Sequence, residues 1–413
     1  MNRRILISGA GIGGPALAWW MAQQGWEVTV VERAPALRDG GQAVDFRGPV
    51  HREVLERMGM WQAICAHRTR GSDMVLLGRS GRPITTLPSV MMSGDLEIQR
   101  GDLSRLLYER TRDIVEYRFG DHLTALDQDP DQVTVRFASG SSASYDLVVG
   151  ADGLHSGVRA LAFGEESKFA RHHGYRIATY SLPNVLGLNG SAFTYTVPGR
   201  ACMVSAESES RARALFVFAG GPLGDERFDA ARQQEVLRAT YHDVGWEVPR
   251  VLAELPHATD LYVDQIATIA IDRYATGRVV LLGDAAYGGT LGGQGTPLAI
   301  VGAYVLAGEL SAARGDHLAA FRQYEARMRP YATSCQKGAE RAGSFFAPRT
   351  RVGLFARDLF YRAFTSRLLI KQFEKLVKSS ATAFELPDYG GAASGLAEGF
   401  RSRGASRAVP RRA

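Results

Sequence analysis

Cysteine is scarce in this chain, with only Cys65, Cys202 and Cys335 among 413 residues. Their number is odd, they lie far apart, and none forms a CxxC pair or a Cys/His pair with metal-ligand spacing. This absence argues against a disulfide framework and against a metal site. We expect free thiols in a reducing cytoplasm and no bound metal.

A long uninterrupted apolar run is also missing from the N-terminus, where Gly9–Gly14 breaks the first hydrophobic stretch. The apolar stretch that follows contains Gln23 and Gln24. We therefore expect no signal peptide, no membrane span and no membrane partner.

The chain also has little net positive charge outside its C-terminus. The net charge is +6, but five arginines fall at the end of the chain: Arg401, Arg403, Arg407, Arg411 and Arg412. The rest is close to neutral, so the composition indicates no nucleic-acid partner. Gly, Ala, Ser and Arg dominate from Gly390 onwards, and residues 389–413 are expected to form a disordered basic tail.

What the N-terminus does contain is a glycine-rich turn between an apolar run, Ile5–Ser8, and a helix-forming segment. Gly9 permits the tight turn, Gly11 lets a pyrophosphate approach the backbone, and Gly14 lets the helix pack closely on the strand. A second apolar run ends at Glu32, which can accept hydrogen bonds from ribose hydroxyls. The helix N-terminus favours phosphate charge. The pattern predicts a dinucleotide site without saying which dinucleotide binds.

Two further apolar runs end in an aspartate beside glycines. One leads to Asp152 and Gly153, and the other leads to Gly283 and Asp284. Ligands bind at the carboxyl edge of open α/β sheets, where such residues lie. For Asp152 alone, capping of the next helix is an equally good interpretation. Asp284 can bind polyol hydroxyls, and the glycine-dense loop after it leads to a predicted helix whose N-terminus can stabilise an anion.

The length of the chain favours two domains. Between about residues 175 and 271 the pattern changes to short strand-like runs. We predict a dinucleotide-binding domain built from residues 1–70, 96–172 and 266–345, and a β-rich domain built from 71–95 and 173–265. Residues 346–388 are predicted to be helical. The apolar stripe from Arg351 to Ser379 is expected to pack on the protein body, with a membrane surface as the alternative.

In order and spacing, the three motifs resemble the flavoprotein aromatic hydroxylases of the p-hydroxybenzoate hydroxylase family, the class A flavoprotein monooxygenases. Gly40–Gly48 and Glu97–Leu103 are most similar to segments of the tetracycline-inactivating monooxygenases and the aromatic polyketide hydroxylases. The resemblance covers nearly the whole chain up to the tail. It implies an α/β fold, with a three-layer FAD-binding domain of the glutathione-reductase (Rossmann) type, an inserted β-sheet substrate domain and a long C-terminal helix.

The resemblance further implies FAD and the residues that hold it. The adenosine half is assigned to the first glycine motif with Glu32 and Arg33, the linking chain to Arg100, and the ribityl and pyrophosphate to Asp284. Asp152 serves both FAD and a transient nicotinamide in that family. The remaining cofactor candidates, on the same motifs and on the loop beside the flavin ring, are Gly41, Gly153, Gly283, Gly293, Gly295 and Thr296.

The reaction implied by the resemblance begins with NADPH or NADH reducing FAD. Oxygen then forms a flavin hydroperoxide, which hydroxylates an aromatic, polyketide or antibiotic-like molecule in biosynthesis or inactivation. Arg47 is a candidate catalytic residue that holds an acidic or phenolate substrate. Asp45 and Arg200 are candidate substrate-binding residues. For both arginines a solvated surface role is equally consistent with the sequence.

Tyr287 is the main departure from the family pattern, because a histidine usually stands there and the following loop is shorter and lacks proline. We treat Tyr287 as a candidate catalytic residue, although the favoured interpretation is that it merely fills the histidine's place against the sheet. The altered loop also motivates the alternative of a non-hydroxylating flavoprotein or a ligand-sequestering FAD-binding protein. A flavin halogenase matches less well, because its Trp-x-Trp-x-Ile-Pro segment is absent. The oligomeric state is left open.

Overall fold

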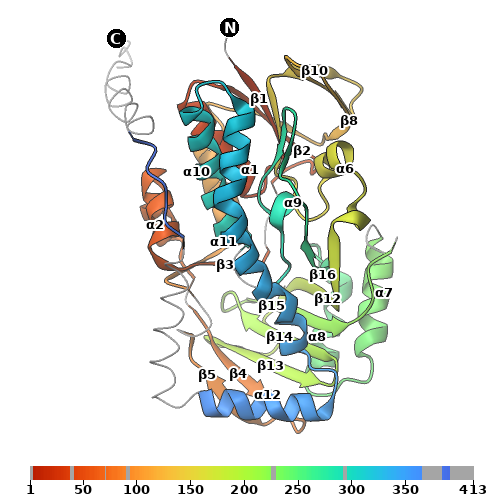
Figure 1. The fold of residues 1–413 in the computed structure, drawn as a ribbon. Helices are drawn as coiled ribbons and strands as arrows, with labels where there is room; N and C mark the ends of the chain where they lie inside the picture. The colour runs from red at the N-terminus through yellow and green to blue at the C-terminus, as the bar shows by residue number, and fades with distance from the viewer. Residues whose placement is uncertain are drawn as a thin grey trace, which may run out of the picture.

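The computed structural model describes residues 3–37, 41–69, 71–89, 94–224, 229–291, 295–364 and 384–390. Two large sheets organise the molecule, one in the upper and one in the lower part of Figure 1. The long helix α11 (His317–Phe346) extends from the upper part to the lower part, beside β12 and β16. The two parts are therefore joined by a helix as well as by strands.

The first sheet has six strands in the order β17-β18-β11-β1-β2-β7. Its strands are β1 (Arg4–Ser8), β2 (Glu27–Glu32), β7 (Glu116–Phe119), β11 (Leu147–Gly150), β17 (Ala275–Thr276) and β18 (Val279–Leu281). All neighbours are parallel except β17 and β18. Ser8 pairs with Gly150, and Gly150 pairs with Leu281. The carboxyl ends of β1, β11 and β18 therefore lie side by side, and the three motifs that follow them meet at one edge.

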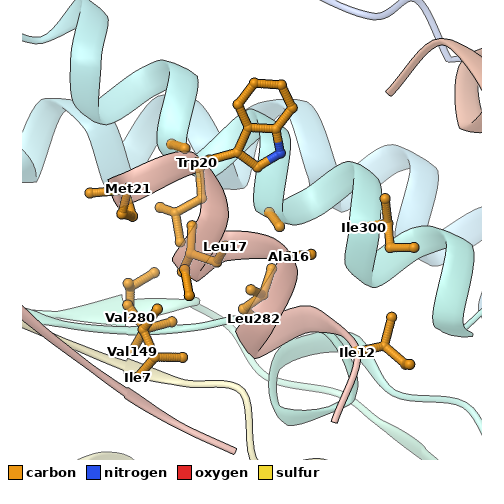
Figure 2. Close-up of a cluster of buried hydrophobic side chains, with 14 of the residues drawn as sticks. Ile7, Ile12, Ala16, Leu17, Trp20, Met21, Val149, Val280, Leu282 and Ile300 are labelled. Atoms are coloured by element: carbon orange, nitrogen blue, oxygen red, sulfur yellow. The ribbon is translucent and has the colours of Figure 1, made fainter. Parts of the chain in front are cut away.

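Helix α1 (Gly13–Gln23) is held between this sheet and helix α10 (Gly295–Ala312). Figure 2 shows Leu17 and Met21 of α1 facing the buried side chains of Ile7, Val149 and Val280. Each such buried side chain contributes roughly 1.5–3 kcal/mol. This packing fixes the start of α1, and with it the glycine turn that precedes the helix.

Helix α10 is long and apolar enough to cross a membrane, and it is the one such helix in the described ranges. Its mean hydropathy is 1.2, but 78% of it is buried inside the protein. It packs against α1, α11 and α2 (Gly48–Arg57). Within this fold, α10 is a core helix.

The second sheet has seven strands in the order β16-β12-β15-β14-β13-β4-β5. Its strands are β4 (Asp73–Leu77), β5 (Pro83–Leu87), β12 (Ala170–Pro183), β13 (Ser191–Val197), β14 (Arg200–Ala206), β15 (Arg211–Ala219) and β16 (Tyr262–Ile269). Residues of α7 (Ala230–Tyr241) and α8 (Val248–Ala253), including Leu237, Tyr241 and Val251, form one buried cluster with Tyr180 and Phe216 of the sheet. These two helices therefore cover one face of the second sheet.

Two smaller sheets and several short helices complete the fold. β3 (Ala43–Phe46) and β6 (Leu96–Gln99) form an antiparallel ribbon, and β8 (Leu123–Gln128), β9 (Val133–Phe137) and β10 (Ser142–Tyr145) form a three-stranded sheet. The other helical elements described are α3 (Trp61–Ala66), α5 (Arg100–Thr111), α6 (Gly157–Phe163), η1 (Glu166–Lys168), η3 (Leu255–His257), α9 (Asp284–Tyr287) and α12 (Arg351–Phe364).

This architecture confirms the predicted fold class, with a mixed α/β unit, a second β-sheet unit and a long helix towards the C-terminus. The predicted boundaries at 173 and 265 fall inside β12 and β16. These two strands pair with each other from Ala170↔Ile269 to Thr179↔Tyr262, with one irregularity between His172 and Arg176. They are thus shared by both units, which is why a change in sequence pattern did not mark their ends.

Helix α12 packs on β5 and β13 at the outer edge of the second sheet. Its buried Arg357 donates to Thr196 Oγ1 at 3.2 Å and to the Phe346 carbonyl at 2.8 Å. Val352 and Phe355 are 78% and 71% exposed, so part of its apolar stripe does not pack on the described residues. Residues 365–379 of the predicted helix lie outside those residues.

Candidate active site

The glycine turn after β1 has the geometry expected for close approach of a phosphate. Gly9 has φ of 108°, and a Cβ placed on it would lie 2.4 Å from the Ala151 carbonyl oxygen. A Cβ placed on Gly14 would lie 1.9 Å from the Gly9 carbonyl oxygen. Gly11 differs, because a Cβ there would meet nothing within 4 Å. Gly9 and Gly14 therefore close the turn, while Gly11 faces open space that a ligand can enter.

Glu32 lies at the end of β2, directly beside this turn. Its Oε2 accepts a hydrogen bond from the Ala10 amide at 2.8 Å, and its Oε1 accepts one from the Ala34 amide at 2.9 Å. The two amide bonds hold the Glu32 carboxylate in a fixed orientation and leave lone pairs for ribose hydroxyls. The neighbouring Arg33 is exposed, and its guanidinium lies near Gly157, where an added Cβ would be 3.8 Å away.

Asp152 lies at the end of β11, and its carboxylate is engaged by the loop that follows. Oδ1 accepts the Ser156 hydroxyl, and Oδ2 accepts the Val158 amide at 3.1 Å and the Ser8 hydroxyl at 3.4 Å. Burial raises the pKa of Asp152, and the bond from Ser156 opposes that shift. Ser156 is the N-cap of α6, with its hydroxyl accepting the Arg159 amide at 2.9 Å, so Asp152 orients the capping residue and the first turn of α6. Gly153, with φ of 83°, has open space around its Cα.

Asp284 begins α9 after Gly283, whose φ is 64°. A Cβ on Gly295, at the start of α10, would lie 3.1 Å from Asp284 Oδ1, so this carboxylate faces the N-terminus of α10. Burial raises the pKa of Asp284, and the nearby Arg100 guanidinium opposes that shift. The Arg100 side chain lies against Gly41, where a Cβ would be 3.4 Å from it.

The structure thus brings most of the predicted cofactor residues to one edge of the first sheet. A Cβ on Gly13 or on Gly283 would lie 3.4 or 3.1 Å from Ala299 of α10, so the first and third motifs pack on the same helix. Thr296 lies in the first turn of α10, and Gly293 lies outside the described residues. The open Gly11 turn, the oriented Glu32 and the positive charge of Arg100 near Asp284 fit an FAD molecule along this edge. Their individual roles remain predictions.

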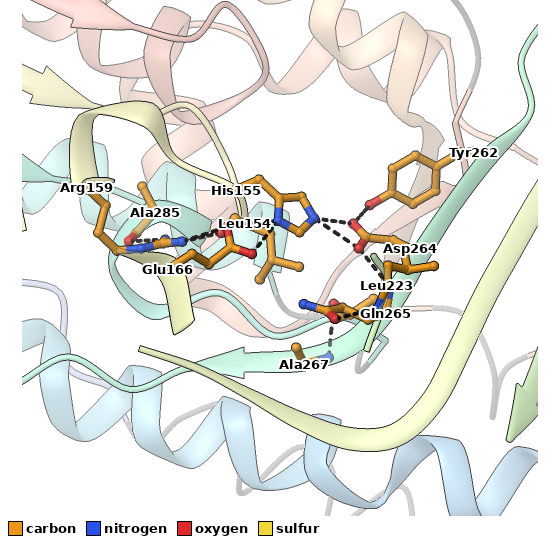
Figure 3. A network of polar contacts seen from close by, with 11 residues as sticks. Leu154, His155, Arg159, Glu166, Leu223, Tyr262, Asp264, Gln265, Ala267 and Ala285 are labelled. Carbon is orange, nitrogen blue, oxygen red and sulfur yellow. Dashed lines mark hydrogen bonds and ion pairs between the residues drawn. The ribbon is translucent and has the colours of Figure 1, made fainter. Parts of the chain in front are cut away.

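His155 connects the two sheets through two carboxylates (Figure 3). Its Nδ1 lies 2.9 Å from both carboxylate oxygens of Glu166, and its Nε2 lies 3.0 Å and 3.2 Å from those of Asp264 on β16. Since a carboxylate only accepts, both ring nitrogens carry protons and the ring is an imidazolium. Burial disfavours this charge, but the bonds to Asp264 and Glu166 outweigh it and raise the pKa of His155 to about 9.

This network extends to the other motifs. Tyr262 donates its hydroxyl to Asp264 Oδ2 at 2.5 Å. Arg159, which is fully buried, donates to the Ala285 carbonyl at 2.9 Å and so contacts the helix that begins at Asp284 (Figure 3). Sequence reasoning missed the pair of His155 and Asp264. His155 stands within the second motif, but no local signal connects it to a carboxylate on a distant strand.

Arg47 and Asp45 lie at the end of the β3–β6 ribbon. Arg47 Nη2 is 3.3 Å from Asp45 Oδ2, with side-chain exposures of 25% and 16%. The Arg47 amide donates to Nδ1 of the buried His51 at 3.1 Å, which fixes the backbone at the start of α2. The two predicted residues are therefore brought together, half-buried, on an element that packs on α10.

Arg200 and Tyr287 lie away from this ribbon. Arg200 forms two bonds with Asp243, at 2.5 and 3.1 Å, and one with the Thr240 carbonyl at 2.6 Å, which join β14 to the end of α7. Tyr287 is 2% exposed, and its hydroxyl lies 3.1 Å from that of Tyr324 in the core. A Cβ on Gly302 of α10 would lie 2.2 Å from that hydroxyl. Both placements agree with structural roles, and the predicted binding and catalytic roles stay predictions.

We expect Tyr287→Phe to affect stability and not turnover. The change removes one buried hydrogen bond, while Tyr324 keeps its bond to the Leu281 carbonyl at 3.1 Å. The free energy of unfolding should fall by about 1 kcal/mol, measured by denaturant titration, with unchanged kcat. A catalytic role for Tyr287 would instead give a loss in kcat of about 100-fold or more without loss of stability.

Comparison with known proteins agrees with this geometry. The sequence profile of the FAD binding domain family matches residues 2–338. A flavin-dependent monooxygenase of Legionella longbeachae is 34% identical over 81% of this chain and 87% of its own. The crystal structures of the tetracycline destructases Tet(51) and Tet(55) are 30% and 32% identical, each with a TM-score of 0.80 over 94% of this chain and 99% of theirs.

These likenesses cover both sheets and include the turn, strand ends and ribbon described above. The flavin-dependent monooxygenases among the relatives match along most of their own length. FAD is therefore the cofactor of this chain. The chain belongs to the FAD binding domain family and is a flavin-dependent monooxygenase, similar to the tetracycline destructases and consistent with the class A flavoprotein monooxygenases.

Proposed function

We propose that this monooxygenase inserts one oxygen atom into a polycyclic aromatic or enolic molecule of the polyketide or antibiotic type, using electrons from NADPH or NADH. The observation that carries the proposal is the similarity to Tet(51) and Tet(55) over 94% of the chain, because it includes the second sheet as well as the FAD-binding unit. In such enzymes the second unit, and not the cofactor motifs, determines which molecule is accepted. A cytoplasmic location belongs to the same proposal.

When bound, reduced FAD supplies the activated oxygen. Glu32 and Arg33 would hold its adenosine half, while Arg100, Asp284 and the start of α10 would hold its phosphate and ribityl chain. The chain's own contribution to the reaction is position and charge. Arg47, with its backbone fixed by His51 and its guanidinium beside Asp45, would pair with the negative oxygen of a phenolate or enolate.

The proposal is tested with the purified holoprotein and a panel of tetracyclines, anthraquinones and simple phenols. We expect a yellow protein whose NADPH or NADH oxidation accelerates with a polycyclic ligand, and a product heavier by one oxygen atom in mass spectrometry. A yellow protein that oxidises neither nicotinamide with any ligand would favour the non-hydroxylating alternative. Acceleration by simple phenols alone would contradict the polycyclic substrate class.

A further inference from the structure

Two carboxyl groups face each other on the β3–β6 ribbon. Asp45 and Glu97 are direct cross-strand partners in the antiparallel register. Like charges in such a pair repel, and partial burial strengthens the repulsion. An ionised pair would therefore destabilise this ribbon, and the arrangement calls for a proton between the two groups.

The oxygens of the pair have unequal partners. Asp45 Oδ2 contacts the Arg47 guanidinium at 3.3 Å, whereas Asp45 Oδ1 is buried without a hydrogen-bond donor among the described residues. Glu97 Oε1 accepts the Thr69 hydroxyl. The two carboxyl groups are within hydrogen-bonding reach of each other. If Glu97 is protonated, its second oxygen becomes a donor and Asp45 Oδ1 gains the partner that it otherwise lacks.

The surroundings of Glu97 favour its neutral form. Burial raises the pKa of Glu97, the Thr69 hydroxyl opposes that shift, and the facing charge of Asp45 adds to it. Arg47 is the cation that acts on the pair, and it favours the ionised form of Glu97. Because Arg47 contacts Asp45 directly, it stabilises the negative charge on Asp45, and the proton is left on Glu97.

We propose that Glu97 is a neutral acid whose O–H donates a hydrogen bond to Asp45 Oδ1, and that the Asp45 carboxylate accepts the hydroxyl proton of a phenolic or enolic substrate beside Arg47. The substrate O–H bond breaks with its electron pair left on the substrate oxygen, and an O–H bond forms on Asp45. The pair then holds two protons, and the new negative charge lies next to the Arg47 guanidinium. Deprotonation makes the ring richer in electrons, as attack on an electrophilic oxygen requires. Glu97 is a positioning residue in this scheme. This inference rests on the proposed function.

The first test is infrared spectroscopy of the holoenzyme without ligand at neutral pH. We expect a carbonyl band of a protonated carboxylic acid that is absent in Glu97→Gln and present in the control Glu56→Gln. Glu56 is a suitable control because it is an exposed carboxylate paired with Arg52 on α2. Identical acid bands in the wild type and Glu97→Gln would overturn the proposal.

The second test uses alizarin, a polycyclic phenol whose colour reports its ionisation, bound to the oxidised holoenzyme about one pH unit below its own pKa. We expect the wild type to bind the ionised form and Asp45→Asn to bind the neutral form. Glu97→Ala should strengthen binding of the ionised form by about 10- to 100-fold, because the lost hydrogen bond stabilises the charged Asp45 of the free protein and not the protonated Asp45 of the complex. Glu97→Gln should bind the ionised form about as the wild type does, because its amide still donates to Asp45.

Alizarin bound in the neutral form by the wild type would overturn the role of Asp45, and equal effects of Glu97→Ala and Glu97→Gln would overturn the role of Glu97. Neither test requires turnover. If the protein shows the acid band and ionises alizarin, yet oxidises no nicotinamide with any ligand, the shared proton is supported and the proposed function is contradicted. If the protein hydroxylates a ligand but shows no acid band, the proposed function is supported and the shared proton of Asp45 and Glu97 is contradicted.

Discussion

Gly14→Ala is expected to reduce the free energy of unfolding by at least about 3 kcal/mol. The added methyl would lie 1.9 Å from the Gly9 carbonyl oxygen, so α1 must shift away from β1. Since α1 is held between the first sheet and α10, that shift disrupts the packing shown in Figure 2. The measurement is denaturant unfolding of the purified apoprotein followed by circular dichroism.

Gly11→Ala is the matched control in the same turn. Its methyl meets nothing within 4 Å, so the apoprotein should unfold within about 0.5 kcal/mol of the wild type. The methyl should nevertheless occupy space that the pyrophosphate needs, and FAD affinity should fall by about tenfold or more. Full flavin content in Gly11→Ala would contradict the location of the cofactor, and equal stability of the two variants would contradict the packing of Gly14.

Stability should decline between about pH 6.5 and pH 9 because of His155, whose pKa rises from 6.5 to about 9 in the folded chain. The folded state binds this proton more tightly than the unfolded state does. The stabilisation is therefore complete below pH 6.5 and is lost as the pH rises through about 9. Its size is on the order of 3 kcal/mol, as for a buried ion pair that loses one partner.

His155→Ala tests this assignment. The variant should be less stable than the wild type at pH 6 and nearly as stable at pH 10, in thermal or denaturant unfolding at both pH values. His242→Ala is the control, because His242 is exposed and bonds only to the Ala239 carbonyl among the described residues. A stability difference between the wild type and His155→Ala that does not change with pH would refute the ion pair.

The parts of this molecule that sequence reasoning predicted are those in which function depends on nearby residues. Gly9 has the positive φ that a tight turn requires, Gly14 must be a glycine because of a contact within the same turn, and Glu32 follows the next strand, so the pattern can be recognised along the chain. The carboxyl-edge positions of Asp152 and Asp284 follow from strand ends in a parallel sheet. The fold class and the cofactor could therefore be predicted.

What sequence reasoning could not supply is the direction of side chains set by distant partners. Arg200 is oriented by Asp243 at the end of α7, and Tyr287 by Tyr324 on α11, and neither contact has a local signature. The facing of Asp45 and Glu97 depends on the register of two strands separated by about fifty residues. For Asp152 the sequence left two interpretations open, and neither could indicate that Ser156 is the cap of α6 and that Asp152 accepts its hydroxyl.

The strand order of the first sheet has a consequence for the newly synthesised chain. β11 ends at Gly150, and its neighbour β18 begins about 130 residues later, after five of the seven strands of the second sheet. At a synthesis rate of about 5–20 residues per second, one edge of β11 stays unpaired on the order of ten seconds. During that time its apolar strand is open to pairing with other chains. Slower folding of the inserted second sheet lengthens the time for which β11 is unpaired. The yield of folded protein during expression should therefore depend on residues of the second sheet, far from the flavin.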